Sequence, residues 1–399
     1  MANSLTAFNP EYWAATMQTV RFRETVALGL ANTEYRSVLS NGDTLNKPYR
    51  SRPVVKTYTK ATDIVSVDRT ATNEYLTVDT AEVVPFYVDD LDRVQNKWNS
   101  VDVFATDAMR ALSSKLDQKV LGEYASATHT VDAGSVGGSA GSAITLTQST
   151  AQPIFSAAAR KLDSYDVTPN NRFACIGPRF LETLRNSLSG RETSFGDQVG
   201  ANGSIGSRFG FNIYFSNNIA FSAVLTTGTI TTADTVTIAG VTFTFKTTAA
   251  TTGEVDLASD SAGTSLLVDA INNTNDYASE AGLATTYFEL SAADRAILSK
   301  YGIKAVLTDA THITISGYGD VIVSTTGADM SWGSEVEHSL FGIKGATDLV
   351  LQKSPSVEFR MAEKRLGRYV YPWQLYGAKT FADMADALVD VQVDASDWV

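Results

Sequence analysis

The residues that could carry chemistry are few, and the histidines come first. His129, His312 and His338 lie in different segments, and their spacing does not suit a metal site. His312 lies in the alternating run Thr-His-Ile-Thr-Ile-Ser, where a histidine on the surface of a strand is the expected arrangement. The histidines therefore give no reason to expect a metal ligand or a catalytic base.

Three other features could be mistaken for sites. Asp89, Asp90 and Asp92 could bind a cation, but they stand where a helix is expected to begin, and the helix dipole favours carboxylates there. The glycine-rich stretch 134–142 has no Lys-Ser or Lys-Thr after it and no buried strand before it, so it is not a phosphate-binding loop. The lone cysteine, Cys175, lies in an apolar run and is expected to be a buried free thiol.

Motifs that mark whole enzyme classes are missing from the sequence. It contains no Gly-x-Ser-x-Gly, His-Glu-x-x-His or Cys-x-x-Cys pattern. We therefore expect no catalytic residues, no metal, no cofactor and no enzymatic activity.

Composition and charge narrow the class of protein. The 399 residues are long enough for two or three domains, and an apolar content of 44% can form real cores. There is no N-terminal apolar segment and no apolar run near 18 residues, so neither secretion nor a membrane span is expected. The net charge of −12 argues against a general nucleic-acid binder.

The charge is unevenly distributed along the chain. Residues 1–60 hold eight Lys and Arg against four acidic residues, whereas 223–345 hold five against fourteen. A basic N-terminal part and an acidic later part indicate two different neighbours, although ordinary solvated surface charge would look the same. Lys and Arg at 47–60 alternate with Tyr49 and Tyr58. These basic residues could contact nucleic-acid phosphates while the tyrosines stack on bases, or they could form salt bridges with a neighbouring subunit.

The N-terminal third predicts a helix, a hairpin and a second, longer helix. Residues 10–31 have helical apolar spacing and no local partner, so this helix should dock on another domain or subunit. Residues 52–91 alternate like strands, with a hairpin tip at 71–73, and are polar on both faces. They fit a long two-stranded arm lying across a neighbouring subunit.

The longest predicted helix covers 91–124, about 50 Å at 1.5 Å per residue. One apolar stripe runs along it at spacings of three or four; a coiled-coil segment is the alternative. Its members are Val94, Trp98, Val101, Ala105, Ala108, Leu112, Leu116 and Val120.

The middle of the chain reads as helix, strand, helix, loop and strand. The helices are expected at 150–165 and 178–187, the strand between them at 172–177, and a Gly/Ser-rich loop at 189–208. The chain then leaves this pattern for about 120 Thr/Ala/Gly-rich residues and resumes it at 349–393. We interpret 223–345 as an inserted α+β domain with alternating strands at 234–248 and 305–328 and its own core.

The order of these elements resembles a tailed-phage major capsid protein of the type first seen in phage Hong Kong 97. The resemblance covers roughly 40–222 and 346–399, about 60% of the chain. The matching positions in the middle of the chain are Ile176, Gly177, Pro178, Leu181, Leu184, Gly206, Gly210, Ile213, Ser216 and Asn217. The matching stretches after 346 are Glu358-Phe359-Arg360, Arg368-Tyr369 and Tyr376-Gly377-Ala378-Lys379. The insert is similar to a module found in several phage structural proteins.

The resemblance implies an α+β capsid fold and a division of the chain. The expected parts are an N-terminal arm (1–50), an extended β-hairpin loop (51–91), a spine helix and peripheral region (92–149), an axial domain (150–222), an insertion domain (223–345) and a return to the axial and peripheral domains (346–399). Because the β-rich region is reached by residue 52, a separate scaffolding protein, or none, is expected.

The resemblance also implies a function without chemistry. Pentamers and hexamers would assemble into an icosahedral shell around double-stranded DNA in the host cytoplasm, with portal and decoration proteins as further partners and only non-specific contact with DNA. The residues expected at inter-subunit contacts are Trp13, Arg21, Arg23, Arg50, Arg52, Tyr58, Tyr75 and Arg191. A bacterial nanocompartment shell and a phage tail or adhesin protein remain the alternatives.

Overall fold

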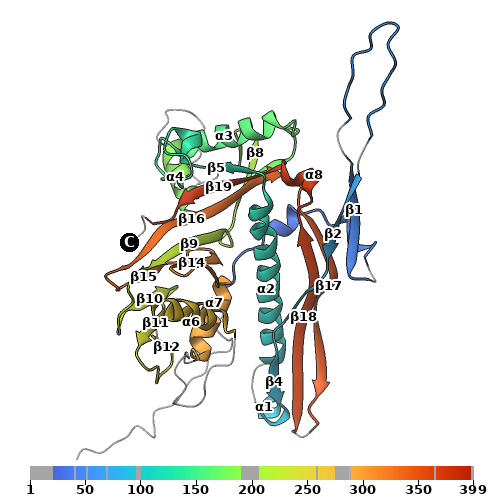
Figure 1. The fold of residues 1–399 in the computed structure, drawn as a ribbon. Coiled ribbons are helices and arrows are strands. Elements are labelled where there is room, and N and C mark those ends of the chain that lie inside the picture. The colour runs from blue at the N-terminus through green and yellow to red at the C-terminus, as the bar shows by residue number, and fades with distance from the viewer. Residues whose placement is uncertain are drawn as a thin grey trace, which may run out of the picture. The chain divides into compact units, whose positions relative to one another are not determined.

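The computed structural model describes residues 21–39, 42–50, 53–68, 71–95, 100–189, 206–257, 259–274, 287, 289–363 and 365–396 (Figure 1). The chain divides into two compact units. The described parts of the smaller unit are residues 21–22, 81–95, 100–113, 353–363 and 365–375. The larger unit holds Arg23–Thr80, Ser114–Gln352 and Tyr376–Val399.

Long strands dominate the smaller unit. Its four-stranded sheet has the order β17-β18-β3, and β4 pairs with β18 in antiparallel register. The strands are β3 (Thr80–Val83), β4 (Phe86–Asp89), β17 (Asp348–Met361) and β18 (Gly367–Lys379), and the ends of β3, β17 and β18 continue into the larger unit.

Within the predicted long helix, the structure describes α1 (Asp90–Gln95) and α2 (Ser100–Leu121), and residues 96–99 between them lie outside the described part. The predicted stripe is buried along α2, at Ala105, Ala108, Leu112, Leu116 and Val120. Val94 on α1 is 80% exposed, so the predicted stripe is not buried at this position. Trp98 and the side chain of Val101 lie outside the described residues.

A nine-stranded sheet forms the centre of the larger unit, in the order β13-β14-β9-β16-β6-β8-β7, with β19 pairing with β16 and β5. Its strands are β5 (His129–Val131), β6 (Arg172–Ile176), β7 (Ser207–Arg208), β8 (Phe211–Phe215), β9 (Ala220–Thr227), β13 (Lys304–Asp309), β14 (His312–Tyr318), β16 (Met330–Ile343) and β19 (Leu388–Asp394). The helices α3 (Ala151–Ser164) and α4 (Pro178–Ser189) agree with the predicted 150–165 and 178–187. Phe155, Phe180, Phe211 and Phe341 form a fully buried aromatic cluster there.

A second sheet and two helices form a lobe between residues 228 and 329. Its strands have the order β12-β11-β10-β15. They are β10 (Thr235–Ile238), β11 (Val241–Lys246), β12 (Glu254–Asp256) and β15 (Val323–Thr325), and the helices are α6 (Asp260–Asn272) and α7 (Ala292–Tyr301). The alternating run at 234–248 is as predicted, since Val236, Phe243 and Phe245 are fully buried.

The boundaries 223–345 of the predicted insertion domain cut across the nine-stranded sheet. Strands β13, β14 and most of β16 come from inside these limits, yet they share the sheet with β6 and β19. The buried cluster of the lobe also includes Phe221 and Ala395, which lie outside the limits. Alternation shows which side chains are buried, but it does not show which strands pair. A domain that folds independently therefore stays a prediction.

The predicted hairpin exists, with different limits. β1 (Thr44–Arg50) pairs with β2 (Ala71–Thr77) in antiparallel register, from Thr44 opposite Thr77 to Arg50 opposite Ala71. The predicted tip at 71–73 is wrong, because these residues begin β2. A described turn lies instead at Thr59–Thr62, closed by a 3.2 Å bond from Thr62 N–H to the Thr59 carbonyl. Asn73 favours a turn whereas Thr72 and Tyr75 favour a strand, so composition alone misplaced the tip.

The predicted helix at 10–31 is wrong over its described part. Residues 21–26 have no regular structure, and Ala27–Gly29 (η2) form a short 3₁₀ turn; residues 10–20 lie outside the described part. The N–H groups of Val26 and Ala27 donate to the side chain of Asp117 on α2, and not to carbonyl groups of a helix of their own. The remaining short elements are η3 (Glu34–Arg36), η4 (Gly122–Ser126), η5 (Ala133–Val136) and α8 (Ala382–Ala385).

Candidate assembly surfaces

The hairpin arm, residues 44–77, exposes apolar side chains far beyond its paired strands. Every residue from 53 to 68 is exposed, and Figure 1 shows this loop extending away from the ends of β1 and β2. Its large apolar members are Val54 (68% exposed), Val55 (93%), Tyr58 (62%), Ile64 (80%), Val65 (70%) and Val67 (47%). Large apolar side chains gathered in one exposed loop indicate an interaction surface, because their hydration is unfavourable unless another surface covers them.

Charge pairs fix the base of the hairpin arm. Lys47 Nζ lies 3.3 Å from Asp348 Oδ2 and 3.2 Å from Asp383 Oδ2, and 4.8 Å from the ring centre of Phe381. Asn32 Nδ2 donates to Asp348 Oδ1 at 2.7 Å. Burial disfavours the Lys47 ammonium, but attraction to the two carboxylates outweighs it and raises the pKa of Lys47. Burial raises the pKa of Asp348, and Lys47 opposes that shift.

The second strand of the arm is also attached to the body of the larger unit. Lys379 Nζ donates to the Tyr75 carbonyl at 2.9 Å and lies 5.5 Å from the Tyr75 ring centre. The Ala382 N–H donates to Glu74 Oε2 at 3.1 Å, and Leu76 is 1% exposed. The arm therefore has a fixed base and an exposed apolar end.

A buried carboxylate holds the N-terminal segment. Asp117, on α2, accepts hydrogen bonds from the N–H groups of Val26 (2.8 Å) and Ala27 (2.6 Å) through Oδ1, and from Asn218 Nδ2 (2.9 Å) through Oδ2. Burial raises the pKa of Asp117, while these donors oppose the shift. Arg23 adds bonds to Asn218 Oδ1 (3.2 Å) and to a backbone carbonyl of β14 (3.0 Å).

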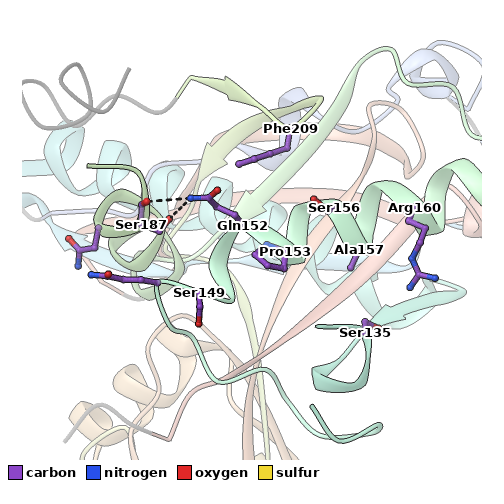
Figure 2. Close-up of a pocket in the computed structure, with 11 residues that line it drawn as sticks. Ser135, Ser149, Gln152, Pro153, Ser156, Ala157, Arg160, Ser187 and Phe209 are labelled. Atoms are coloured by element: carbon purple, nitrogen blue, oxygen red, sulfur yellow. Dashed lines mark hydrogen bonds between the residues drawn. The ribbon is translucent and has the colours of Figure 1, made fainter. Parts of the chain in front are cut away.

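A surface pocket of about 860 Å³ lies along α3 (Figure 2). Gln152, Ser156 and Arg160 line it from α3, Ser187 from α4, and Phe209 from the turn before β8. Gln152 Nε2 donates to the Ser187 carbonyl and hydroxyl, at 3.3 Å each, which Figure 2 shows as dashed lines. A neighbouring hollow of about 570 Å³ shares Ser156, Arg160 and Phe209. Arg160 and Phe209 line both hollows, and arginine and aromatic side chains are enriched at protein–protein contacts.

The predicted contact residues have different surroundings. Arg21, Arg50, Tyr58 and Tyr75 are exposed. Arg23 is half-buried and bonded within its own chain, with its guanidinium 4.9 Å from the Tyr301 ring centre. The other three predicted residues, Trp13, Arg52 and Arg191, lie outside the described part of the chain.

Sequence reasoning included Lys47 among the basic residues at 47–60, but it missed the pairing of Lys47 with Asp348 and the role of Asp117. Lys47 and Asp348 are 301 positions apart, so no local pattern connects them. Asp117 had a weak signal, since it is a carboxylate directly beside Leu116 in the apolar stripe of a helix. A buried carboxylate needs donors, and Asp117 finds them in a segment 90 residues away.

Metal binding and thiol chemistry find no support among the described residues. Among them, no group of three or more His, Cys, Asp or Glu side chains could hold a metal ion. Cys175 is fully buried, and burial raises the pKa of its thiol. No helix within the described ranges is long and apolar enough to cross a membrane.

We compared the chain with protein families and with curated proteins. The sequence profile of a phage capsid protein family matches residues 77–262. No curated protein matches the chain.

Several solved structures share the fold. A structure of Mycobacterium phage Che8 is 17% identical, covers 97% of this chain and 98% of its own, and gives a TM-score of 0.59. The capsid of the cyanophage P-SCSP1u is 12% identical, with coverages of 99% and 96% and a TM-score of 0.55. The mature capsid of bacteriophage PhiM1 is 10% identical, with coverages of 98% and 93% and a TM-score of 0.52. At these identities the likeness concerns the fold.

Proposed function

We propose that this chain is a structural capsid protein that assembles as pentamers and hexamers into a closed icosahedral shell around double-stranded DNA, a role supported by the match of residues 77–262 to a phage capsid family and by the fold. The observation that carries the proposal is the hairpin arm, whose base is fixed by Lys47 and whose six large apolar side chains at 54–67 are exposed. In a shell, the end of the arm lies on a neighbouring subunit, which covers these side chains. Burial of apolar area then stabilises the contact by roughly 25 cal/mol per Å².

Other parts of the molecule have roles that agree with this one. The N-terminal segment, held at Asp117, ties neighbouring subunits together, and the pocket along α3 faces an adjacent subunit of the same pentamer or hexamer. The acidic lobe projects from the shell and is available to a decoration protein. Scaffolding and portal proteins take part in assembly in the host cytoplasm, and the packaged DNA is contacted only non-specifically.

A nanocompartment shell enclosing a cargo enzyme is the nearest alternative. The profile match to phage capsid proteins and the phage capsids among the similar structures favour a phage head. Particle diameter separates the two, because a phage head must enclose a genome.

The test is electron microscopy of the purified chain and of two paired variants. Val55→Asp with Ile64→Asp places charges in the apolar end of the arm, where burial of an unpaired carboxylate costs several kcal/mol. Thr57→Asp with Ser66→Asp adds the same charge at exposed polar positions of the same loop. We expect shells or capsomer rings from the natural chain and from the Thr57/Ser66 variant, and none from the Val55/Ile64 variant. Normal shells from the Val55/Ile64 variant would refute the role of the arm.

A further inference from the structure

A serine, a histidine and an aspartate meet on three neighbouring strands of the nine-stranded sheet. Ser222 lies on β9, His338 on β16 and Asp390 on β19, and β16 pairs with both of the other strands. His338 is directly opposite Ala220 on β9 and Gln392 on β19, so Ser222 and Asp390 are each two positions from its direct partners. Because side chains alternate between faces with a period of two, all three side chains lie on the same face.

The three side chains form a continuous hydrogen-bonded chain. The Ser222 hydroxyl lies 2.8 Å from His338 Nε2, and His338 Nδ1 lies 3.0 Å from both carboxylate oxygens of Asp390. The carboxylate requires an N–H at Nδ1, so Nε2 of the neutral ring is left as an acceptor for the serine hydroxyl. This is the order nucleophile, base and orienting carboxylate that activates serine in unrelated hydrolase folds, where geometry rather than sequence position defines the arrangement.

Two further residues hold the base and the carboxylate in place. The ring of Tyr124 stacks on the imidazole of His338 with a centroid distance of 4.0 Å and an interplanar angle of 19°. Gln392 Nε2 donates to Asp390 Oδ2 at 3.1 Å. Tyr124 therefore limits rotation of the imidazole, and Gln392 fixes the carboxylate.

Exposure to solvent increases from the carboxylate through the imidazole to the serine. Asp390 and His338 are 4% and 6% exposed, whereas Ser222 is only half-buried. The serine is therefore the most exposed member of the three. The structural role proposed for the shell requires none of this arrangement.

We propose that Ser222 is an activated nucleophile that accepts the acyl or phosphonyl group of small activated esters. Ser222 Oγ forms a bond to the carbonyl carbon or phosphorus while its proton moves to His338 Nε2. The bond to the leaving group then breaks, and the leaving group departs as the anion or takes the proton from Nε2. With a carboxylic ester, attack by water in the reverse sequence releases the acid and restores the serine.

Turnover is expected to be slow, for a reason visible in the sheet. β9 is paired with β14 on one side and β16 on the other, so backbone N–H groups around Ser222 are used in the sheet. A developing oxyanion therefore finds no preorganised backbone donor there, and one such donor contributes roughly 100-fold or more in rate. The expected behaviour is stoichiometric labelling by a strong electrophile rather than rapid ester hydrolysis.

The experiment is incubation of the purified full chain with a fluorophosphonate, which releases fluoride on reaction, followed by intact-mass measurement and peptide mapping. We expect one adduct, on Ser222, that disappears in Ser222→Ala. His338→Gln and Asp390→Asn should slow labelling on the order of 100-fold, the usual contribution of a general base. Ser316→Ala is the matched control, since Ser316 is a half-buried serine directly opposite Ser222 on β14 and should not affect the adduct.

A second measurement keeps the proposal testable if the histidine variant unfolds. Ser222→Cys places a thiol beside the same base, and Cys175, the only natural cysteine, is fully buried. Alkylation of the introduced thiol should be much faster than in Ser222→Cys combined with His338→Asn, with thermal melting used to check that both are folded. No fluorophosphonate adduct, an adduct retained in Ser222→Ala, or equal alkylation rates would show that the three residues only stabilise the sheet.

Discussion

The glutamate Glu337 on β16 should make the subunit less stable as the pH rises, and the size of the effect can be calculated. Its side chain is half-buried with Oε1 shielded from solvent, and it lies against Gly177, where an added Cβ would clash with Glu337 Oε1. Burial raises the pKa of Glu337 from 4.5 to about 7, and the attraction of Arg179 offsets only part of the shift. The folded state therefore holds a proton on Glu337 at pH values where the unfolded chain has lost it.

Stability decreases with rising pH because the pKa of Glu337 is higher in the folded state than in the unfolded chain. Because the folded pKa lies above the unfolded one, the stabilisation is complete below about pH 4.5 and is lost as the pH rises through about 7. Over the whole range the loss is about 3 kcal/mol, at 1.36 kcal/mol per pKa unit. Between about pH 5.5 and about pH 8.5 the loss of stability is about 2 kcal/mol. The rest is already lost below about pH 5.5, where Glu337 of the unfolded chain has released its proton.

Glu337→Gln keeps the shape of the side chain and removes its titration. The free energy of unfolding of this variant, relative to the natural chain, should rise by about 2 kcal/mol between about pH 5.5 and about pH 8.5. Urea unfolding of the unassembled subunit, followed by tryptophan fluorescence at both pH values, measures it. Glu182→Gln, on the exposed face of α4, is the matched control and should give no such change. A difference between Glu337→Gln and the natural chain that is the same at both pH values would refute the reasoning.

Two other predictions concern the arm and the lobe. Lys47→Met removes the cation from between two carboxylates, of which Asp348 is 2% exposed, so the free energy of opening the base of the arm should fall by about 1–2 kcal/mol. Amide exchange in β1 and β2 should then be faster than in the control variant Lys60→Met. Equal exchange in the two variants would show that the charge pairs contribute little. The fragment 220–343, which keeps β9, should fold alone and give a dispersed NMR spectrum. The fragment 228–345 should not, because Ile313 and Ile315 on β14 keep β13 but lose β9, one of their two partner strands. A dispersed spectrum from 228–345 would show that the lobe is independent of the sheet.

Local periodicity predicted the elements whose packing is set by their own spacing. The helices α3 and α4 and the stripe along α2 follow from apolar residues three and four apart, and Leu112 and Leu116 are buried as expected. The alternation at 234–248 likewise identified Phe243 and Phe245 as core residues. In these segments one face of a single element determines which side chains are buried, so the sequence contains the information.

Pairing between distant strands could not be predicted in the same way. Ser222 and His338 are 116 positions apart, and their meeting depends on the register of β9 against β16. The displaced hairpin tip has the same cause, because nothing local distinguishes an exposed strand at 71–77 from a turn. The predicted helix near residue 27 failed because a carboxylate on α2 competes for the backbone N–H groups of that segment.

The pairing of β16 also determines how the lobe transmits force. β16 leads directly out of the lobe and is paired with β19 from Val336 to Gly342, and with β6 from Phe341 to Ile343. A pull on the lobe along β16 therefore loads these hydrogen bonds together, in shear, instead of opening them one after another from an end. Anything bound to the lobe would be mechanically connected to the centre of the larger unit by the strongest loading geometry that a sheet offers.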